Sequence, residues 1–190
     1  VEVLGTFSYA TLHKRGAKRI GRIEIFNLIF NIGINHPALF TLNSIISFIG
    51  SVFFLLARRP NVVVISVPTG DTALGILAAC SLLKVRHVID YRDEWEDYAV
   101  SLSNSRTGRS FCVAVKKLAT CLYFKSHLVV AVNSVYAMLL RHRGVPKIKL
   151  VPNGADLGTF KPLDNEGKDK RFTLFYSGSI GGYYRLDVVV

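Results

Sequence analysis

Four short, β-branched runs follow one another through the middle of the chain, and each ends at a cluster of polar residues or glycines. These runs are Val62–Val67, Arg86–Tyr91, His127–Val132 and Ile148–Val151. Short runs that are apolar at nearly every position are typical of parallel strands buried on both faces. Ligands of open parallel sheets bind beyond the carboxyl ends of the strands. The pattern therefore predicts a parallel sheet and also the edge at which its chemistry takes place.

Segments with helical periodicity separate these runs. We expect helices at Thr72–Lys84, Ser110–Lys125 and Ser134–Arg143, whereas the polar stretch Ser101–Arg109 is expected to be a flexible loop. Strands that alternate with helices through mostly short connections favour an α/β fold with a doubly wound parallel sheet, that is, a Rossmann-like layer.

The first part of the chain is harder to interpret. Val1–Tyr9 could be a strand, and Thr11–Arg22 a loop or the start of a basic helix. Ile25–Ile34 and Ala38–Ala57 both have the character of helices, and His36-Pro37 separates them.

The segment Ala38–Ala57 is long enough to span a bilayer. Its small and polar residues nevertheless fall on one helical stripe, which suggests a face against protein or a helix lying in the membrane interface. Three alternatives stay open: a helix packed on the sheet, in-plane contact with a membrane, and a true span. The stripe consists of Asn43, Ser44, Ser47, Gly50 and Ser51.

The formal net charge of +11 is concentrated in part near the start, where no acid lies between Glu2 and Glu24. A basic surface suits anionic lipid or phosphorylated small molecules. No RNA-binding signature accompanies the basic run, so we expect no nucleic-acid partner. The three cysteines form no C-x-x-C pair and lie in apolar segments, which indicates reduced, buried thiols in a cytoplasmic protein.

The composition changes after residue 156. A charged, apolar-poor segment at 157–171 separates a first domain at 1–156 from a new strand and glycine-containing loop at 172–190. Because the chain begins at Val1 and ends within an apolar run, we expect a fragment: a Rossmann-like domain truncated at its start, a linker, and the first strand, loop and helix opening of a second domain.

Three clusters at predicted strand ends could carry chemistry. After the second strand, a carboxylate of Asp93 could orient a hydroxyl group and the Arg92 guanidinium could bind a phosphate, although Asp90, Arg92 and Asp93 could equally pair with each other and fix the loop. Pro152-Asn153-Gly154 has the sequence of a tight turn. Gly178–Gly182 would allow backbone amides to approach a diphosphate at a helix start, or would be a plain βα turn.

The order of these pieces resembles the retaining, GT-B-fold glycosyltransferases of family 4. The likeness spans about Arg59–Asp187 and rests on four stretches, of which the third is the most specific. They are Arg59–Val64 with Pro68, Asp90–Trp95, Gly144–Asp156 with Phe160-Lys161-Pro162, and Tyr176–Gly181. Some family members carry a histidine near the second stretch, and this chain does not, so a histidine base at that place is in doubt.

The resemblance implies transfer of a sugar from a nucleotide-sugar donor to a lipid-linked or surface-polysaccharide acceptor. It implies catalytic roles for Arg92 and Asp93, with no metal and no further cofactor. Acceptor-binding residues would be Asp90, Glu94 and Trp95, the last of which could instead anchor its loop. Donor-binding residues would be Gly178, Ser179, Gly181, Asn153 and Gly154. The expected location is cytoplasmic, peripheral at the inner face of the cell membrane, and the fragment by itself should not turn over.

Two other functions remain. A Rossmann-like module could bind at the membrane through Ala38–Ala57 without catalysis. A nucleotide-dependent oxidoreductase is disfavoured, because no predicted strand is followed by G-x-G-x-x-G. The glycosyltransferase hypothesis requires that Asp93, Asn153 and Gly178 reach a common crevice between two lobes.

Overall fold

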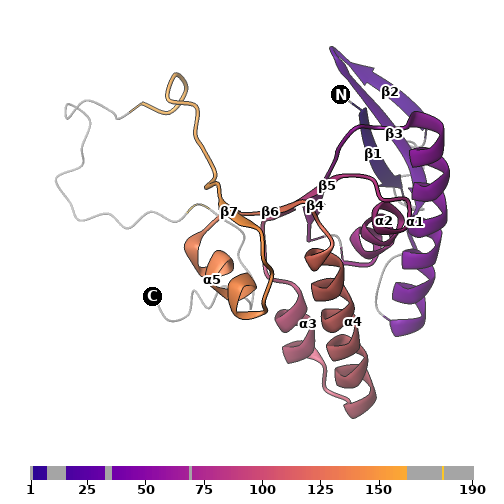
Figure 1. The fold of residues 1–190 in the computed structure, drawn as a ribbon, viewed down its shortest axis with the longest axis vertical. Helices are drawn as coiled ribbons and strands as arrows, with labels where there is room; N and C mark the ends of the chain where they lie inside the picture. Colours follow the sequence, from indigo (N-terminus) through magenta and orange to yellow (C-terminus); the bar gives the residue numbers. More distant parts are fainter. Residues whose placement is uncertain (1, 8–15, 33–35, 69, 162–176, 178–190) are drawn as a thin grey trace. The chain divides into compact units, whose positions relative to one another are not determined.

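The computed structural model describes residues 2–7, 16–32, 36–68, 70–161 and 177 (Figure 1). The chain divides into two compact units, Val1–Asn153 and Gly154–Val190. In the second unit the described residues 154–161 contain a turn at 157–159 and no helix or strand. The strand and loop predicted at 172–190 lie outside the described residues, apart from Ser177.

The predicted parallel sheet is confirmed. It contains β4 (Val63–Val67), β5 (His87–Tyr91), β6 (Leu128–Ala131) and β7 (Ile148–Leu150), side by side in that order. Every neighbouring pair is parallel, with Val63 opposite His87 at one end and Ala131 opposite Leu150 at the other. All four carboxyl ends therefore reach one edge of the sheet.

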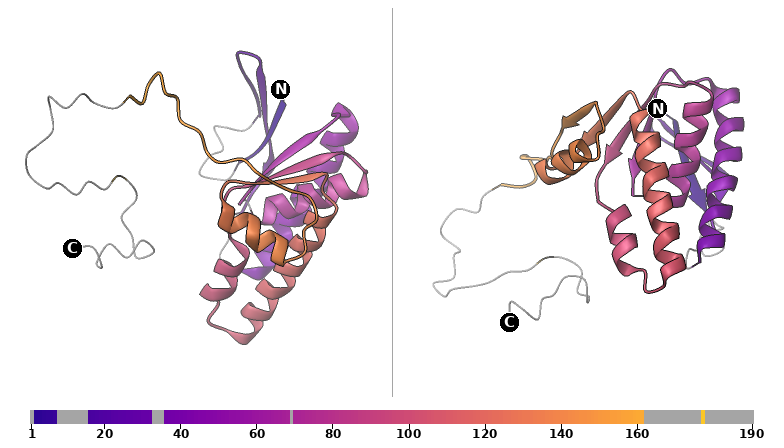
Figure 2. Two further views of the ribbon diagram at one scale, coloured as in Figure 1. Left: turned by 60° about the vertical axis from the view of Figure 1, so that its left-hand side comes forward. Right: turned by 60° about the horizontal axis from the view of Figure 1, so that its bottom comes forward.

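The connecting helices cover one face of this sheet (Figures 1 and 2). They are α2 (Gly70–Leu82), α3 (Glu96–Leu102), α4 (Arg106–Phe124) and α5 (Ser134–His142). Right-handed crossovers that always step in the same direction place their helices on the same side. Alternate strand residues such as Ile65, Ile89 and Val129 are buried, whereas Val64 on the other face is 67% exposed. Among the described residues, the strand order of this sheet contains no reversal, so the doubly wound arrangement remains a prediction.

The prediction of a loop at Ser101–Arg109 is wrong at both ends of that segment. Helix α3 extends to Leu102 and α4 already begins at Arg106. The Ser105 hydroxyl accepts a hydrogen bond from the Gly108 N–H, 3.0 Å away, and so caps the first turn of α4. The polar residues that suggested a loop are a helix end and a helix cap.

The helix predicted at Ile25–Ile34 is also wrong. A second sheet holds β1 (Glu2–Phe7), β3 (Ile23–Phe30) and β2 (Gly16–Ile20), in that order. β2 and β3 form an antiparallel hairpin, with Gly21 at φ +58° in its turn, so Gly16–Ile20 is neither a loop nor a basic helix. β1 pairs with β3 in parallel. The β-branched and aromatic residues of Ile23–Phe30 favour a strand once two partner strands are present.

Helix α1 (Pro37–Arg58) confirms the helix expected at Ala38–Ala57. Its small and polar stripe lies against α2, where Asn43, Ser47 and Ser51 are buried. The two backbones meet so closely that a Cβ on Gly75 would lie 2.5 Å from the Ser44 carbonyl oxygen. The Ser47 hydroxyl donates to the carbonyl of Thr72 at 2.9 Å. One open alternative, a face against protein, therefore describes this stripe.

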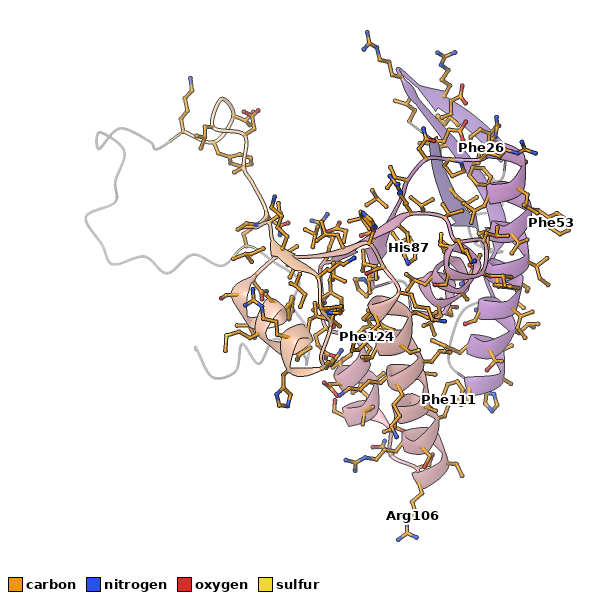
Figure 3. All side chains as sticks on the ribbon, viewed as in Figure 1. Phe26, Phe53, His87, Arg106, Phe111 and Phe124 are labelled. Carbon is orange, nitrogen blue, oxygen red and sulfur yellow. The ribbon has the colours of Figure 1, made fainter. Side chains whose placement is uncertain are left out.

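The opposite side of α1 is apolar and exposed. Phe53 is 70% exposed and points away from the rest of the fold (Figure 3). By length and composition α1 could cross a membrane, a criterion that core helices of soluble proteins also meet. The exposed residues follow helical spacing and form what we term the outer stripe: Leu42, Ile45, Ile49, Phe53 and Leu56.

Candidate functional site

The carboxyl edge of the parallel sheet brings together three of the predicted site residues. Arg92, directly after β5, donates from Nη2 to Oδ1 of Asn153, 3.1 Å away and 61 positions later in the chain. The Arg92 Nη1 lies 3.9 Å from a carboxylate oxygen of Asp90. The Arg92 side chain remains about half exposed, so its guanidinium can also reach an anion from solvent.

Asp93 lies beside this group and is held by α5. Its Oδ1 accepts hydrogen bonds from the Tyr136 hydroxyl and from the N–H of Glu94, both at 2.8 Å. The Asn133 side chain accepts a hydrogen bond from the Tyr136 N–H and so caps α5, which fixes the first helical turn that carries Tyr136. Among the described residues, Oδ2 of Asp93 has no hydrogen-bond partner, so it can accept from a hydroxyl of a bound molecule. We call Asp90, Arg92, Asp93 and Asn153 the rim cluster.

A second polar group lies beneath the rim cluster and is buried. Glu96 is 1% exposed and accepts from the hydroxyls of Tyr91 and Tyr123, each at 2.7 Å. Arg143 lies 3.4 Å from the same carboxylate. Burial raises the pKa of Glu96 above its ordinary value, although the two tyrosines and Arg143 act in the opposite direction. Burial and the Glu96 charge also raise the pKa of both tyrosines.

Arg143 joins Glu96 to two further carboxylates. Its Nη2 donates to Glu94 and to Asp97, both at 2.7 Å, and its side chain is only 8% exposed. Burial would lower the pKa of Arg143, but these hydrogen bonds and the Glu96 charge raise it. For Asp97 burial acts to raise the pKa, but hydrogen bonds from Lys116 and Arg143 outweigh it and lower the pKa. We call Glu94, Glu96, Asp97 and Arg143, with the two tyrosines, the buried network.

Glu94, predicted to bind an acceptor, therefore belongs to the buried network and not to the rim cluster. One of its carboxylate oxygens accepts from the N–H of Asp97 at 2.8 Å and the other from that of Tyr98 at 3.2 Å. These contacts satisfy N–H groups in the first turn of α3. The predicted mutual pairing of Asp90, Arg92 and Asp93 is present only between Arg92 and Asp90.

Trp95, three residues after Arg92, is partly buried and packs against the core. Its ring stacks on Phe40 of α1 with centroids 6.3 Å apart, and a Cβ on Gly70 would lie 3.6 Å from it. Trp95 also lines a pocket of 740 Å³ between the start of α1, α3 and α4. The stacking on Phe40 is of the kind that a loop-anchoring aromatic makes.

The remaining predicted residues are not assembled into this site. Gly154 begins the second unit, and a Cβ there would meet nothing within 4 Å. Gly178, Ser179 and Gly181 lie outside the described residues. Within the described part of the chain, no three His, Cys, Asp or Glu side chains converge as metal ligands. Cys80 is buried as predicted, but Cys121 is exposed on α4, which corrects the expectation for that thiol.

Sequence reasoning missed Tyr136, Glu96 and Arg143. The run of acids at Glu94, Glu96 and Asp97 was a signal, because clustered carboxylates that enter a fold need a cation. Nothing local pointed to Arg143, which comes from the end of α5.

A separate buried group connects the end of β3 with α1 and α2. Asp71, 3% exposed, accepts hydrogen bonds from Asn43 at 2.8 Å and Asn31 at 3.0 Å. Asn43 also bonds both the N–H and the carbonyl of Ile32 at 3.0 Å. This group fixes the end of β3 against α1 and α2.

No family model matches the chain, and no curated protein matches it. The coarse architecture, a mixed α/β fold with a four-stranded parallel sheet flanked by helices, is compatible with a Rossmann-like domain.

Proposed function

We propose that this chain is the acceptor-side part of a GT-B glycosyltransferase, which transfers a sugar from a nucleotide-sugar donor to a lipid-linked or surface-polysaccharide acceptor. The observation that carries the proposal is the rim cluster. A half-exposed guanidinium, an available carboxylate oxygen and an amide meet at the carboxyl edge of a parallel sheet, where ligands of such sheets bind. This arrangement suits a molecule that bears both phosphate and hydroxyl groups.

Each member of the rim cluster has a distinct role in this proposal. Arg92 binds a phosphate oxygen, and Asn153 and Asp90 orient its guanidinium. Asp93 accepts a hydrogen bond from the attacking hydroxyl through Oδ2, while Tyr136 holds Oδ1. Stabilisation of the leaving diphosphate belongs to the predicted loop at Gly178–Gly182, which would supply backbone amides.

A transfer assay tests the proposal. The full polypeptide that carries this chain is incubated with radiolabelled nucleotide sugars and a polyprenyl-diphosphate-linked sugar, and label in the organic phase is counted. Arg92→Ala is expected to lower kcat/KM by about 10- to 100-fold, because a hydrogen bond to a charged group contributes about 1.5–3 kcal/mol. Arg86→Ala, an exposed position at the opposite, amino end of β5, is the matched control. Absent transfer with a folded protein, or equal transfer by the two variants, contradicts the proposal.

The outer stripe favours a second candidate, a non-catalytic Rossmann-like module that associates with membranes. Exposed apolar residues at helical spacing suit a helix that lies in the membrane interface. This candidate predicts sedimentation with anionic vesicles and no transfer of any sugar. The two assays together separate the candidates, because only the glycosyltransferase requires Arg92.

A further inference from the structure

Two adjoining pockets form a groove between α1 and α4, and the second of them is almost entirely apolar. The pocket beside Trp95 shares three walls, Phe40, Phe111 and Val115, with a second pocket of 370 Å³ that extends along α4 to Leu122. The Phe40 and Phe111 rings meet edge to face, 5.8 Å apart, at the junction. From Gly108 to Leu122, α4 rises about 21 Å, which gives the length of the groove.

The walls of the second pocket offer carbon and almost no hydrogen bonds. Its two hydroxyl groups are already used within α1: Thr41 donates to the Pro37 carbonyl at 2.9 Å and Ser44 to that of Phe40 at 3.0 Å. An extended peptide would leave its backbone groups unpaired in such a groove, at a cost for each group. A hydrocarbon chain has no such groups to satisfy.

The charge of the two helices identifies the kind of hydrocarbon. Neither α1 nor α4 contains an aspartate or glutamate. Helix α4 carries Arg106 and Arg109 in its first turn, where Thr107 and Gly108 line the first pocket. The surfaces beside the groove therefore complement an anionic head group.

The groove also opens onto an unusual helix face. Ile45 belongs both to the groove wall and to the outer stripe. In α1 the small and polar stripe faces protein and the apolar stripe faces outward, the reverse of a surface helix in a soluble protein. The groove thus leads from an exposed apolar face to Trp95, next to the rim cluster.

From these observations we propose that the α1–α4 groove binds the hydrocarbon chain of an anionic, phosphate-bearing lipid. One end of this hydrocarbon chain lies at the outer stripe, and the other end lies beside Trp95. The inference rests on the proposed function, because it makes the lipid-linked acceptor the substrate class of the rim cluster. The groove places the chain and the rim cluster places the phosphate.

Trp95 is the single tryptophan of the chain, so its fluorescence reports on the groove directly. The full chain is mixed with vesicles of phosphatidylcholine and phosphatidylglycerol whose acyl chains carry bromine, and with unbrominated vesicles. Bromine is expected to lower Trp95 emission about twofold, because a pocket of this kind buries most of its ligand. Ala114→Phe narrows the groove at an exposed position of α4 and is expected to remove the quenching. Ala57→Phe adds the same ring to an exposed position outside the groove and should change nothing.

Equal emission in both kinds of vesicle overturns the proposal, as does quenching that Ala114→Phe leaves intact. A dimer in sedimentation analysis that Ala114→Phe dissociates would also overturn it, because a second copy would then cover the groove. The assay contains no sugar donor. Quenching without transfer by the full polypeptide therefore contradicts the proposed transfer alone, and transfer without quenching contradicts the groove alone.

Discussion

The rim cluster and the buried network are neighbours in the chain and in space, yet they have opposite designs. Arg92 in the rim cluster is half exposed and has two partners, Asn153 and Asp90. Arg143 in the buried network is enclosed and contacts three carboxylates. Both arginines contact acidic side chains, but no residue next to Arg143 in the sequence marks it as the enclosed one.

The unequal exposure of Arg92 and Arg143 separates a group suited to binding from a group suited to stabilising the fold. Exposed ion pairs contribute little to folding, because water already solvates both charges. A buried ion pair holds charges that cannot be left without a partner, so removal of one member is costly. We therefore expect the buried network to hold the loop after β5 in place, and the rim cluster to remain available for a ligand.

The largest expected effect is the loss of the buried arginine. Arg143→Ala leaves Glu96 enclosed without a cation and should lower the free energy of unfolding by about 3–5 kcal/mol. Arg141→Ala, an exposed position on the same helix, is the control and should cost under about 0.5 kcal/mol. Urea denaturation measures both. If the alanine variant does not fold, Arg143→Lys, which keeps one positive charge, is measured instead. A loss of unfolding free energy as small as that of Arg141→Ala would contradict the structural role of Arg143.

The next effect concerns pH. Because burial raises the pKa of Glu96, the folded protein keeps a proton that the unfolded chain releases near its ordinary pKa of about 4.3. Glu96 therefore makes unfolding easier as pH rises from that value to the raised folded pKa. Glu96→Gln lacks this dependence, so its stability relative to the unsubstituted protein should increase with pH, by up to about 1.4 kcal/mol per pH unit within the window.

Urea denaturation from mildly acidic to neutral pH measures this difference. Asp97, whose pKa is lowered, acts in the opposite direction: its contribution is present above the unfolded pKa and is lost as pH falls. It is present in both proteins and largely cancels. A constant difference between the two proteins across the range would show that the enclosure of Glu96 does not affect its titration.

The smallest expected effect is on the rim cluster. Arg92→Ala should change the free energy of unfolding by less than about 1 kcal/mol, since its ion pair with Asp90 is exposed and 3.9 Å long. Asn153→Ala should behave alike. Thermal and urea unfolding measure both variants. A loss above about 2 kcal/mol would make the rim cluster a structural element and would weaken its case as a binding site.

Much of the sheet could be predicted from particular residues. The β-branched runs and the polar clusters that end them located β4 to β7 to within one or two residues, because short apolar runs bounded by turn residues favour strands. The expected burial of these strands on both faces was wrong, since Val64 on the uncovered face is largely exposed. The prediction for Ile23–Phe30 was wrong because a short apolar run fits a helix or a strand, and its partners β1 and β2 decide between them. The helix cap at Ser105 was missed because a polar residue that caps a helix and a polar residue in a loop look the same in the sequence.

The parallel sheet, the edge at which Arg92, Asp93 and Asn153 lie, and the two-sided character of α1 could all be inferred from the sequence. They follow from the periodicity of each segment, the order of the segments and the polar residues that end the strands. The folded structure was needed to establish which side of α1 faces protein, which arginine is enclosed, and that Glu94 points into the buried network. Those outcomes depend on contacts between residues as far apart in the chain as Glu94 and Arg143, or Asn43 and Asp71. The spacing of residues within one segment does not show whether a distant element will bury them.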